Sequence, residues 1–138
     1  MKAGGVLAAA IAALLCGHGA ALACGESLGG ATRQIENAQL RLVYKSTPNP
    51  IPVGQHFSID FAVCPLGTAA APTELRVDAS MPEHKHGMNY RPTVAARGSG
   101  LYRAEGLMFH MPGRWELVFE LRGGPAAPLR LTQLLQVE

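Results

Sequence analysis

Most of the chain after Asn37 consists of short segments in which apolar and polar residues alternate. A period of two residues is typical of a β-strand that buries one face and exposes the other. The cleanest example is the run Trp115, Leu117, Phe119 and Leu121, and Trp115 is expected to anchor a core. We predict about seven strands, within residues 40–45, 57–63, 75–81, 91–97, 101–111, 115–121 and 129–137.

Proline and glycine separate these segments. Pro48, Pro50 and Pro52 lie in a stretch that must form an extended turn, because proline fixes φ and lacks an amide donor. Gly98-Ser99-Gly100 separates two segments that favour a hairpin. No segment after the N-terminal apolar run has a helical period, so we predict an all-β fold, an antiparallel two-sheet sandwich of immunoglobulin-like type. A closed barrel is the alternative, because the pattern does not distinguish one closed sheet from two stacked sheets.

The first 23 residues are predicted to be a secretory signal peptide. Lys2 supplies a positive charge, Val6–Leu15 is an apolar run, and Ala21-Leu22-Ala23 has the small side chains that signal peptidase requires. Cleavage before Cys24 would leave one domain, residues 24–138, with no transmembrane segment. A membrane anchor is the competing interpretation, but the run is shorter than the roughly 20 residues of a spanning helix. We therefore expect an exported, periplasmic protein.

Charge and cysteine content narrow the partners and the compartment. Without Lys2, eleven Lys and Arg residues stand against ten Asp and Glu residues, with no block of either sign. This balance disfavours nucleic acid and anionic membranes as partners. Cys24 and Cys64 would be the two cysteines of the exported chain, and in an oxidising compartment we expect them to form a disulfide. Metal ligation, or a lipid on Cys24, is the alternative.

Methionine and histidine are concentrated between residues 81 and 111. This window holds the four methionines of the exported chain and three of its four histidines: Met81, Met88, Met108, Met111, His84, His86 and His110. Thioether sulfur is a soft donor that suits Cu(I), and imidazole binds both Cu(I) and Cu(II). In an extended chain His84, His86 and Met88 project from one side, and Gly87 permits a turn that closes them on an ion. Alternation places Met108 and His110 on one face.

Each of these residues also has a structural interpretation. Met81 and Met111 continue buried faces of predicted strands, so both fit a core. His84 and His86 fit a solvated loop, and His110 fits a hydrogen-bonded histidine beneath that loop.

Zinc is the lesser alternative to copper, because three histidines with Glu83 would make a tetrahedral N/O site. The methionines count against zinc, and the scarcity of carboxylates in the window counts against calcium and magnesium. The fourth histidine, His56, begins a predicted strand and is expected to be structural.

The sequence gives catalysis no positive support. A blue-copper carrier needs a cysteine closely followed by His and Met ligands, whereas Cys64 is followed by Pro65-Leu66-Gly67. A copper enzyme that cleaves polysaccharides needs an N-terminal histidine, and here the predicted first residue is Cys24. Motifs for a serine nucleophile, a phosphate-binding glycine loop or a zinc protease are also missing from the sequence. We therefore expect a protein that is not an enzyme.

Three motifs follow one another along the second half of the chain: Met81-Pro82-Glu83-His84-Lys85-His86-Gly87-Met88, then Gly100-Leu101-Tyr102, then Met111-Pro112-Gly113-Arg114-Trp115. In this order they resemble the YtkA-like domain family, whose pattern is Met-Pro-x-His-x-His-Gly-Met, Gly-x-Tyr and Met-x-Gly-x-Trp. The resemblance runs from Pro50 to the C terminus. It implies an exported or membrane-tethered immunoglobulin-like sandwich that serves copper handling or oxidase assembly.

The chain is also similar, more distantly, to FixH-like accessory proteins and to periplasmic Cu(I) chaperones with a His/Met set on a cupredoxin-like sandwich. The ligand spacing of those chaperones is absent here. The leading hypothesis is a copper chaperone or buffer of copper homeostasis that delivers the ion to a periplasmic or membrane cuproprotein. The alternative is a metal-independent module that assembles a membrane or periplasmic complex through its histidine loop.

Overall fold

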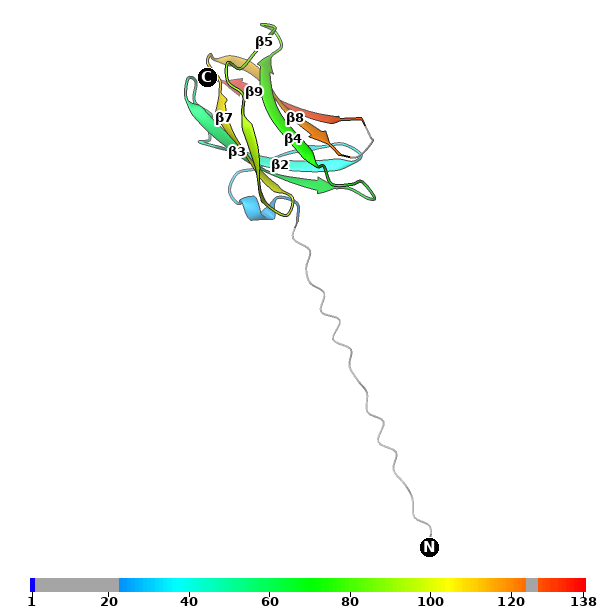
Figure 1. Cartoon of the computed structure of the whole chain (residues 1–138). Helices are drawn as coiled ribbons and strands as arrows, with labels where there is room; N and C mark the ends of the chain where they lie inside the picture. Colours follow the sequence, from blue (N-terminus) through cyan, green and yellow to red (C-terminus); the bar gives the residue numbers. More distant parts are fainter. Residues whose placement is uncertain (2–22, 124–126) are drawn as a thin grey trace.

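Two antiparallel sheets stack face to face in the computed structural model of the chain (Figure 1), which describes residues 1, 23–123 and 127–138. One sheet has the strand order β1-β2-β3-β7-β6 and the other β5-β4-β8-β9. The elements are η1 (Glu26–Leu28), β1 (Arg33–Glu36), β2 (Leu40–Thr47), β3 (His56–Pro65), β4 (Glu74–Met81), β5 (His86–Gly87), β6 (Thr93–Gly98), β7 (Leu101–Met108), β8 (Gly113–Arg122) and β9 (Leu129–Val137). The predicted all-β sandwich is confirmed.

The core lies between the inward faces of the two sheets. Alternation sends one residue in two into this space, so β3 contributes Phe57, Ile59 and Phe61 from one side while β8 contributes Trp115 and Phe119 from the other. Phe61 packs edge-on against Phe119 across the layer, with ring centres 5.3 Å apart. The central strands are therefore fixed by large buried side chains, and the edge strands are less constrained.

The described residues form nine strands, two more than the predicted seven, because two short strands lack an alternating apolar pattern. β1 lies in the polar N-terminal segment, where Ile35 is its one apolar residue. It forms through backbone pairing with β2, in which Arg33 lies opposite Tyr44. β5 has two residues and pairs with the end of β4. Such pairings depend on the partner strand and leave little trace in their own sequence.

A disulfide joins Cys24 to Cys64, as predicted, with 6.0 Å between their Cα atoms. It ties the segment before η1 to β3 across a sequence separation of 40 residues. In the chain-entropy model, closing a loop of this length is worth about 4 kcal/mol. The predicted signal peptide, residues 1–23, lies almost wholly outside the described residues. Within the described part of the chain, no helix is long and apolar enough to cross a membrane.

Two connections meet at one end of the sandwich. The β4–β5 hairpin projects there, beside the loop that joins β7 to β8 (Figure 1). β7 ends at Met108, three residues earlier than predicted, and the carbonyl of Phe109 accepts a hydrogen bond from the Gly54 amide instead of continuing the ladder. Residues 109–112 thus leave the sheet next to the hairpin and carry His110 with them.

Candidate functional site

A tight turn presents the first histidine. After Met81 the chain reverses over residues 82–85, where the His84 amide donates to the Met81 carbonyl at 3.1 Å and the Lys85 amide to the Pro82 carbonyl at 3.4 Å. Lys85 takes a left-handed φ of 54° to complete the turn. The sequence predicts a turn at Gly87, whereas the structure has the turn before His86, at residues 82–85. His84 lies exposed in this turn.

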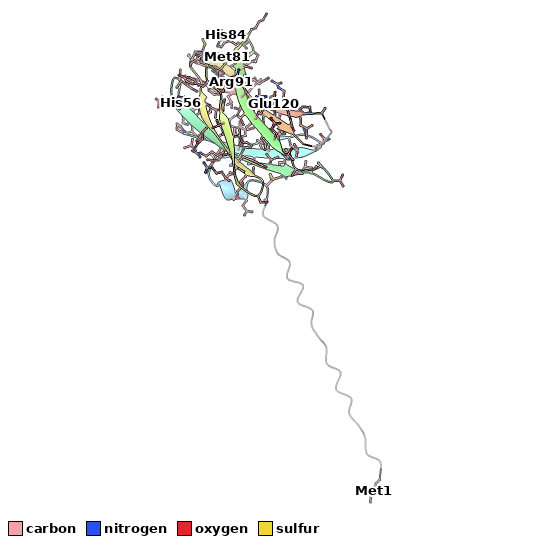
Figure 2. The ribbon with its side chains drawn as sticks, viewed as in Figure 1. Met1, His56, Met81, His84, Arg91 and Glu120 are labelled. Atoms are coloured by element: carbon pink, nitrogen blue, oxygen red, sulfur yellow. A yellow bond between two sulfur atoms is a disulfide. The ribbon has the colours of Figure 1, made fainter. Side chains whose placement is uncertain are left out.

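The turn directs His86 inward. In the β4–β5 pairing, His86 lies opposite Met81 and Gly87 opposite Ser80. Directly opposed residues of an antiparallel pair share a face, and Met81 is only 1% exposed on the core side. His86 consequently points toward the interior and is half-buried. His84 is exposed at the end of the molecule (Figure 2).

Three imidazoles converge at this end of the molecule. The ring centres of His84 and His86 are 5.6 Å apart, and those of His86 and His110 are 5.2 Å apart. Trp115 lies beneath them, with its ring centre 5.3 Å from that of His110 and 6.2 Å from that of His86, both edge to face. We call His84, His86, His110 and Met81 the His/Met cluster. The 84–86 segment and His110, which are distant in sequence, thus lie side by side.

Two ring nitrogens in the cluster have no hydrogen-bond partner within the part of the chain that the structure describes. These are Nε2 of His86 and Nδ1 of His110, and both are buried. A buried polar atom without a partner costs about 1–3 kcal/mol, and such atoms are rare in folded proteins. The two nitrogens therefore either lower the stability of the fold with no compensation or bind a group that is not part of the protein.

Met81 brings a thioether to the same place. Its backbone lies opposite His86, and its methyl carbon Cε lies so near Gly113 that a Cβ there would be 2.8 Å away. The methyl end of the Met81 side chain thus reaches the start of β8, directly after the loop that carries His110. The sequence is compatible with Met81 as a core residue or as a ligand, and the structure is compatible with both because Met81 belongs to the core cluster and lies opposite His86.

Trp115 fixes the floor of the cluster. Its indole stacks on Phe109, with ring centres 4.6 Å apart and planes 15° from parallel. Its Nε1 donates to the carbonyl of Met111 at 3.0 Å. Through this bond Trp115 holds the β7–β8 loop as well as the core, so the sequence prediction of a core anchor describes only part of its position.

The remaining three methionines occupy other places. Met88 packs against the core and lines a groove of about 550 Å³ along the β4–β6 side, together with Tyr90 and Arg91. Met108 lies opposite His56 in the β3–β7 pairing. Met111 is partly buried against the core. β7 ends at Met108, so the placement of Met108 and His110 on one face of a strand stays a prediction.

His56 lies outside the cluster. It is exposed at the start of β3, its Nδ1 is 3.3 Å from the carbonyl oxygen of Leu107, and its ring packs against Tyr90 at 4.9 Å. Figure 2 shows it on the flank of the sandwich, well below His84. The structural role expected of His56 agrees with this position.

The cluster is free of carboxylates in the described residues around it. Glu83, the nearest acid in sequence, forms an exposed ion pair with Arg114 at 3.4 Å. Within residues 23–123 and 127–138, no group of three His, Cys, Asp or Glu side chains is already arranged to hold a metal ion. The rings would have to turn about their side-chain torsions to share one ion.

That rotation requires little change in the distance between the ring centres. Two imidazoles bound to one ion at about 2.0–2.1 Å with tetrahedral angles have ring centres roughly 5 Å apart. The His86 and His110 ring centres, at 5.2 Å, already have this separation. The arrangement therefore suits an ion that takes neutral nitrogen and sulfur donors.

Comparisons with known proteins add little to this description. The chain matches no protein-family model and none of the curated proteins. Its fold is similar to the crystal structure of a DUF4426 family protein from Pseudomonas aeruginosa PAO1, with a TM-score of 0.49 and 8% sequence identity over 76% of this chain and 93% of that chain. The resemblance to the YtkA-like domain family stays a prediction.

Proposed function

We propose that the His/Met cluster binds one copper ion and that the protein is a non-catalytic copper carrier or buffer outside the cytoplasm. The observation that carries the proposal is the pair of buried nitrogens, Nε2 of His86 and Nδ1 of His110, without hydrogen-bond partners in the described chain. An ion bound between the rings would satisfy a nitrogen of each. His84 at the rim and the Met81 thioether below would complete a set of four donors.

The donor types favour copper over zinc. Imidazole binds either metal, but a thioether is a soft ligand that suits Cu(I) and is not a usual zinc ligand. The carboxylate that zinc would prefer as a fourth ligand, Glu83, is turned to Arg114 instead. A neutral His/Met set also leaves the charge of a Cu(I) ion uncompensated by the protein, which suits an ion that must later be released to a partner.

The position of the cluster favours exchange. His84 is exposed, and β5 is held to β4 by only two residue pairs. Short edge elements with few contacts open at low free-energy cost. An acceptor protein could thus take the ion from the exposed side by displacing His84 first, while Met81 and Trp115 stay in place in the core.

A competition titration tests the proposal. The mature protein, residues 24–138, is titrated with Cu(I) against a chromogenic chelator, and the fluorescence of Trp115, the one tryptophan of the chain, is followed in parallel. We expect one equivalent of Cu(I) to bind and to quench Trp115, because the ion would lie beside rings that contact the indole. His86→Ala and His110→Ala should each weaken binding by more than the roughly 10- to 100-fold that losing a group hydrogen-bonded to a ligand costs.

His56→Ala is the matched control, because His56 is an exposed histidine outside the cluster. The Cu(I) affinity of this variant should equal that of the unaltered protein. If the protein takes no copper from a weak chelator, or if His56→Ala weakens binding as much as His110→Ala, the proposal fails. Tighter binding of Zn(II) than of Cu(I) under the same competition would assign the site to zinc. Capture of a partner by the metal-free protein, without copper binding, would favour the assembly module.

A further inference from the structure

A second cavity lies on the side of the sandwich where the edge strands β1 and β9 approach each other. It has a volume of about 520 Å³ and is bounded by β1, β2, the loop after β2 and the end of β9. Small-molecule sites commonly have volumes of roughly 300–1,000 Å³. None of the described residues that line it belongs to the His/Met cluster.

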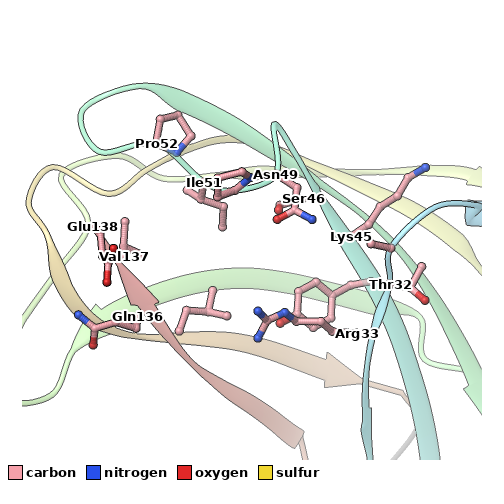
Figure 3. A pocket seen from close by; sticks show the side chains of 14 residues that line it. Thr32, Arg33, Lys45, Ser46, Asn49, Ile51, Pro52, Gln136, Val137 and Glu138 are labelled. Atoms are coloured by element: carbon pink, nitrogen blue, oxygen red, sulfur yellow. The ribbon is translucent and has the colours of Figure 1, made fainter.

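The walls of the cavity are largely apolar, with a cationic group on one side. Ile51, Leu135 and Val137 provide aliphatic surface from the loop and from β9. Figure 3 shows Arg33 across the cavity from Val137 and Glu138. An occupant would therefore meet apolar side chains along its body, the positive charge of Arg33 at one end and the acidic side chain of Glu138 at the other.

Tyr44 adds a buried donor beside that charge. It lines the cavity, is only 2% exposed, and its hydroxyl has no hydrogen-bond partner within the described residues. The ring cannot easily turn away, because it packs on Phe119 with centres 5.5 Å apart. The hydroxyl is left with a proton to donate and no protein acceptor to receive it.

The side chains of Arg33 and Tyr44 lie next to each other at the cavity. They are direct partners in the β1–β2 pairing, so their side chains leave the sheet on one face with Cβ atoms roughly 4.5–5.5 Å apart. Burial raises the pKa of Tyr44 to about 12, more than the Arg33 charge lowers it, so the phenol is neutral and donates at neutral pH. Arg33 forms no ion pair with any residue that the structure describes, whereas Lys45 donates to the carbonyls of Leu28 and Gly29.

We propose that this cavity binds a small carboxylate with an apolar body, whose carboxylate accepts hydrogen bonds from the Arg33 guanidinium and the Tyr44 hydroxyl. A guanidinium matches a carboxylate with two parallel hydrogen bonds, and the phenol supplies a third donor. The apolar body lies along Ile51, Leu135 and Val137. The cavity and the His/Met cluster are separate sites, so this binding does not depend on copper.

Calorimetry on the copper-free mature protein tests the proposal with octanoate and 3-phenylpropionate as probes and 1-octanol as the uncharged comparison. At least one carboxylate should bind more tightly than the alcohol and shift the backbone amide signals of Arg33, Ile51 and Leu135. Arg33→Gln and Tyr44→Phe should each weaken that binding roughly tenfold to a hundredfold, which is the effect of losing a hydrogen bond to a charged group.

Two control variants separate this effect from general changes in the protein. Tyr102→Phe removes a hydroxyl from β7, and Arg97→Gln removes an exposed arginine from β6, and neither residue lines the cavity. Both should bind the carboxylate as the unaltered protein does. The proposal is overturned if neither carboxylate binds, if octanol binds as tightly as octanoate, or if the controls weaken binding as much as Arg33→Gln and Tyr44→Phe do.

Discussion

His110 has a buried ring nitrogen, Nδ1, without a hydrogen-bond partner in the described residues, and this atom separates a structural role from a ligand role. A structural histidine stabilises the fold through its hydrogen bonds, so replacing it is costly. A histidine kept for an external ligand lowers the stability of the ligand-free protein. The two roles therefore predict opposite signs for the same substitution.

His110→Phe should raise the free energy of unfolding of the copper-free protein by about 1 kcal/mol, since the unsatisfied nitrogen is replaced by carbon of similar shape. The same variant should lose high-affinity copper binding. Urea unfolding curves measure the first effect and chelator competition the second. His56→Phe, which changes an exposed histidine, should not stabilise the protein, and a clear loss of stability in His110→Phe would contradict the ligand role.

Tyr44 gives the protein a specific weakness at alkaline pH. Its pKa is raised by burial to about 12 in the folded state, against 10.0 for an unperturbed tyrosine. The unfolded chain therefore releases this proton first as the pH rises. The contribution to stability is complete below pH 10 and is lost progressively as the pH rises toward 12.

Between pH 9 and pH 11 this loss amounts to about 1 kcal/mol. Tyr44→Phe should lose that much less stability over the same interval, as measured by urea unfolding at a series of pH values. Tyr102→Phe is the control, because Tyr102 is only partly buried. Equal alkaline losses in the unaltered protein and in Tyr44→Phe would show that Tyr44 does not keep its proton through burial.

At the scale of elements, the cluster depends on how closely the β4–β5 hairpin approaches the start of β8. Gly113 begins β8 with a φ of 127°, a backbone conformation that residues other than glycine rarely adopt. The space where its side chain would lie is filled by the methyl group of Met81. Glycine at this position lets the thioether reach the loop that carries His110.

Gly113→Ala should therefore displace Met81 and weaken copper binding, in addition to a backbone strain of roughly 1–3 kcal/mol. Gly67→Ala is a matched control, because Gly67 also has a positive φ, 57°, but nothing lies within 4 Å of the added carbon. It should destabilise the fold without changing copper affinity. Chelator competition on both variants decides the point, and equal affinities would remove Met81 from the ligand set.

The elements also show where sequence reasoning succeeds and where it stops. Alternation of apolar and polar residues was sufficient to predict the long strands, because the residues of β3 or β8 themselves define its buried face. The same pattern predicted a strand up to residue 111, but β7 ends at Met108, where the Gly54 amide donates a hydrogen bond to the Phe109 carbonyl. It also failed for β1, whose partner supplies the reason for pairing. These outcomes depend on contacts between distant segments, which no local pattern contains.

At the scale of the whole molecule, the two sites that we propose lie on separate parts of one sandwich. The cysteine pair and the grouping of methionine with histidine could be recognised from the sequence, and the disulfide is confirmed. The cavity beside Tyr44 could not, since Arg33 and Tyr44 become neighbours only through the β1–β2 pairing. The signal that was missed is a tyrosine, Tyr44, at an apolar position of the predicted strand, since a buried hydroxyl usually needs a hydrogen-bond partner.

X-ray absorption at the copper edge of the one-to-one Cu(I) complex tests the central claim most directly, because it identifies the atoms bound to the ion. We expect two or three nitrogen ligands with the outer-shell scattering of imidazole, together with one sulfur from Met81 that disappears in Met81→Leu. His56→Ala should leave the spectrum unchanged. A complex without imidazole scattering, or one whose spectrum is the same when His86 and His110 are both replaced by alanine, would contradict the central claim.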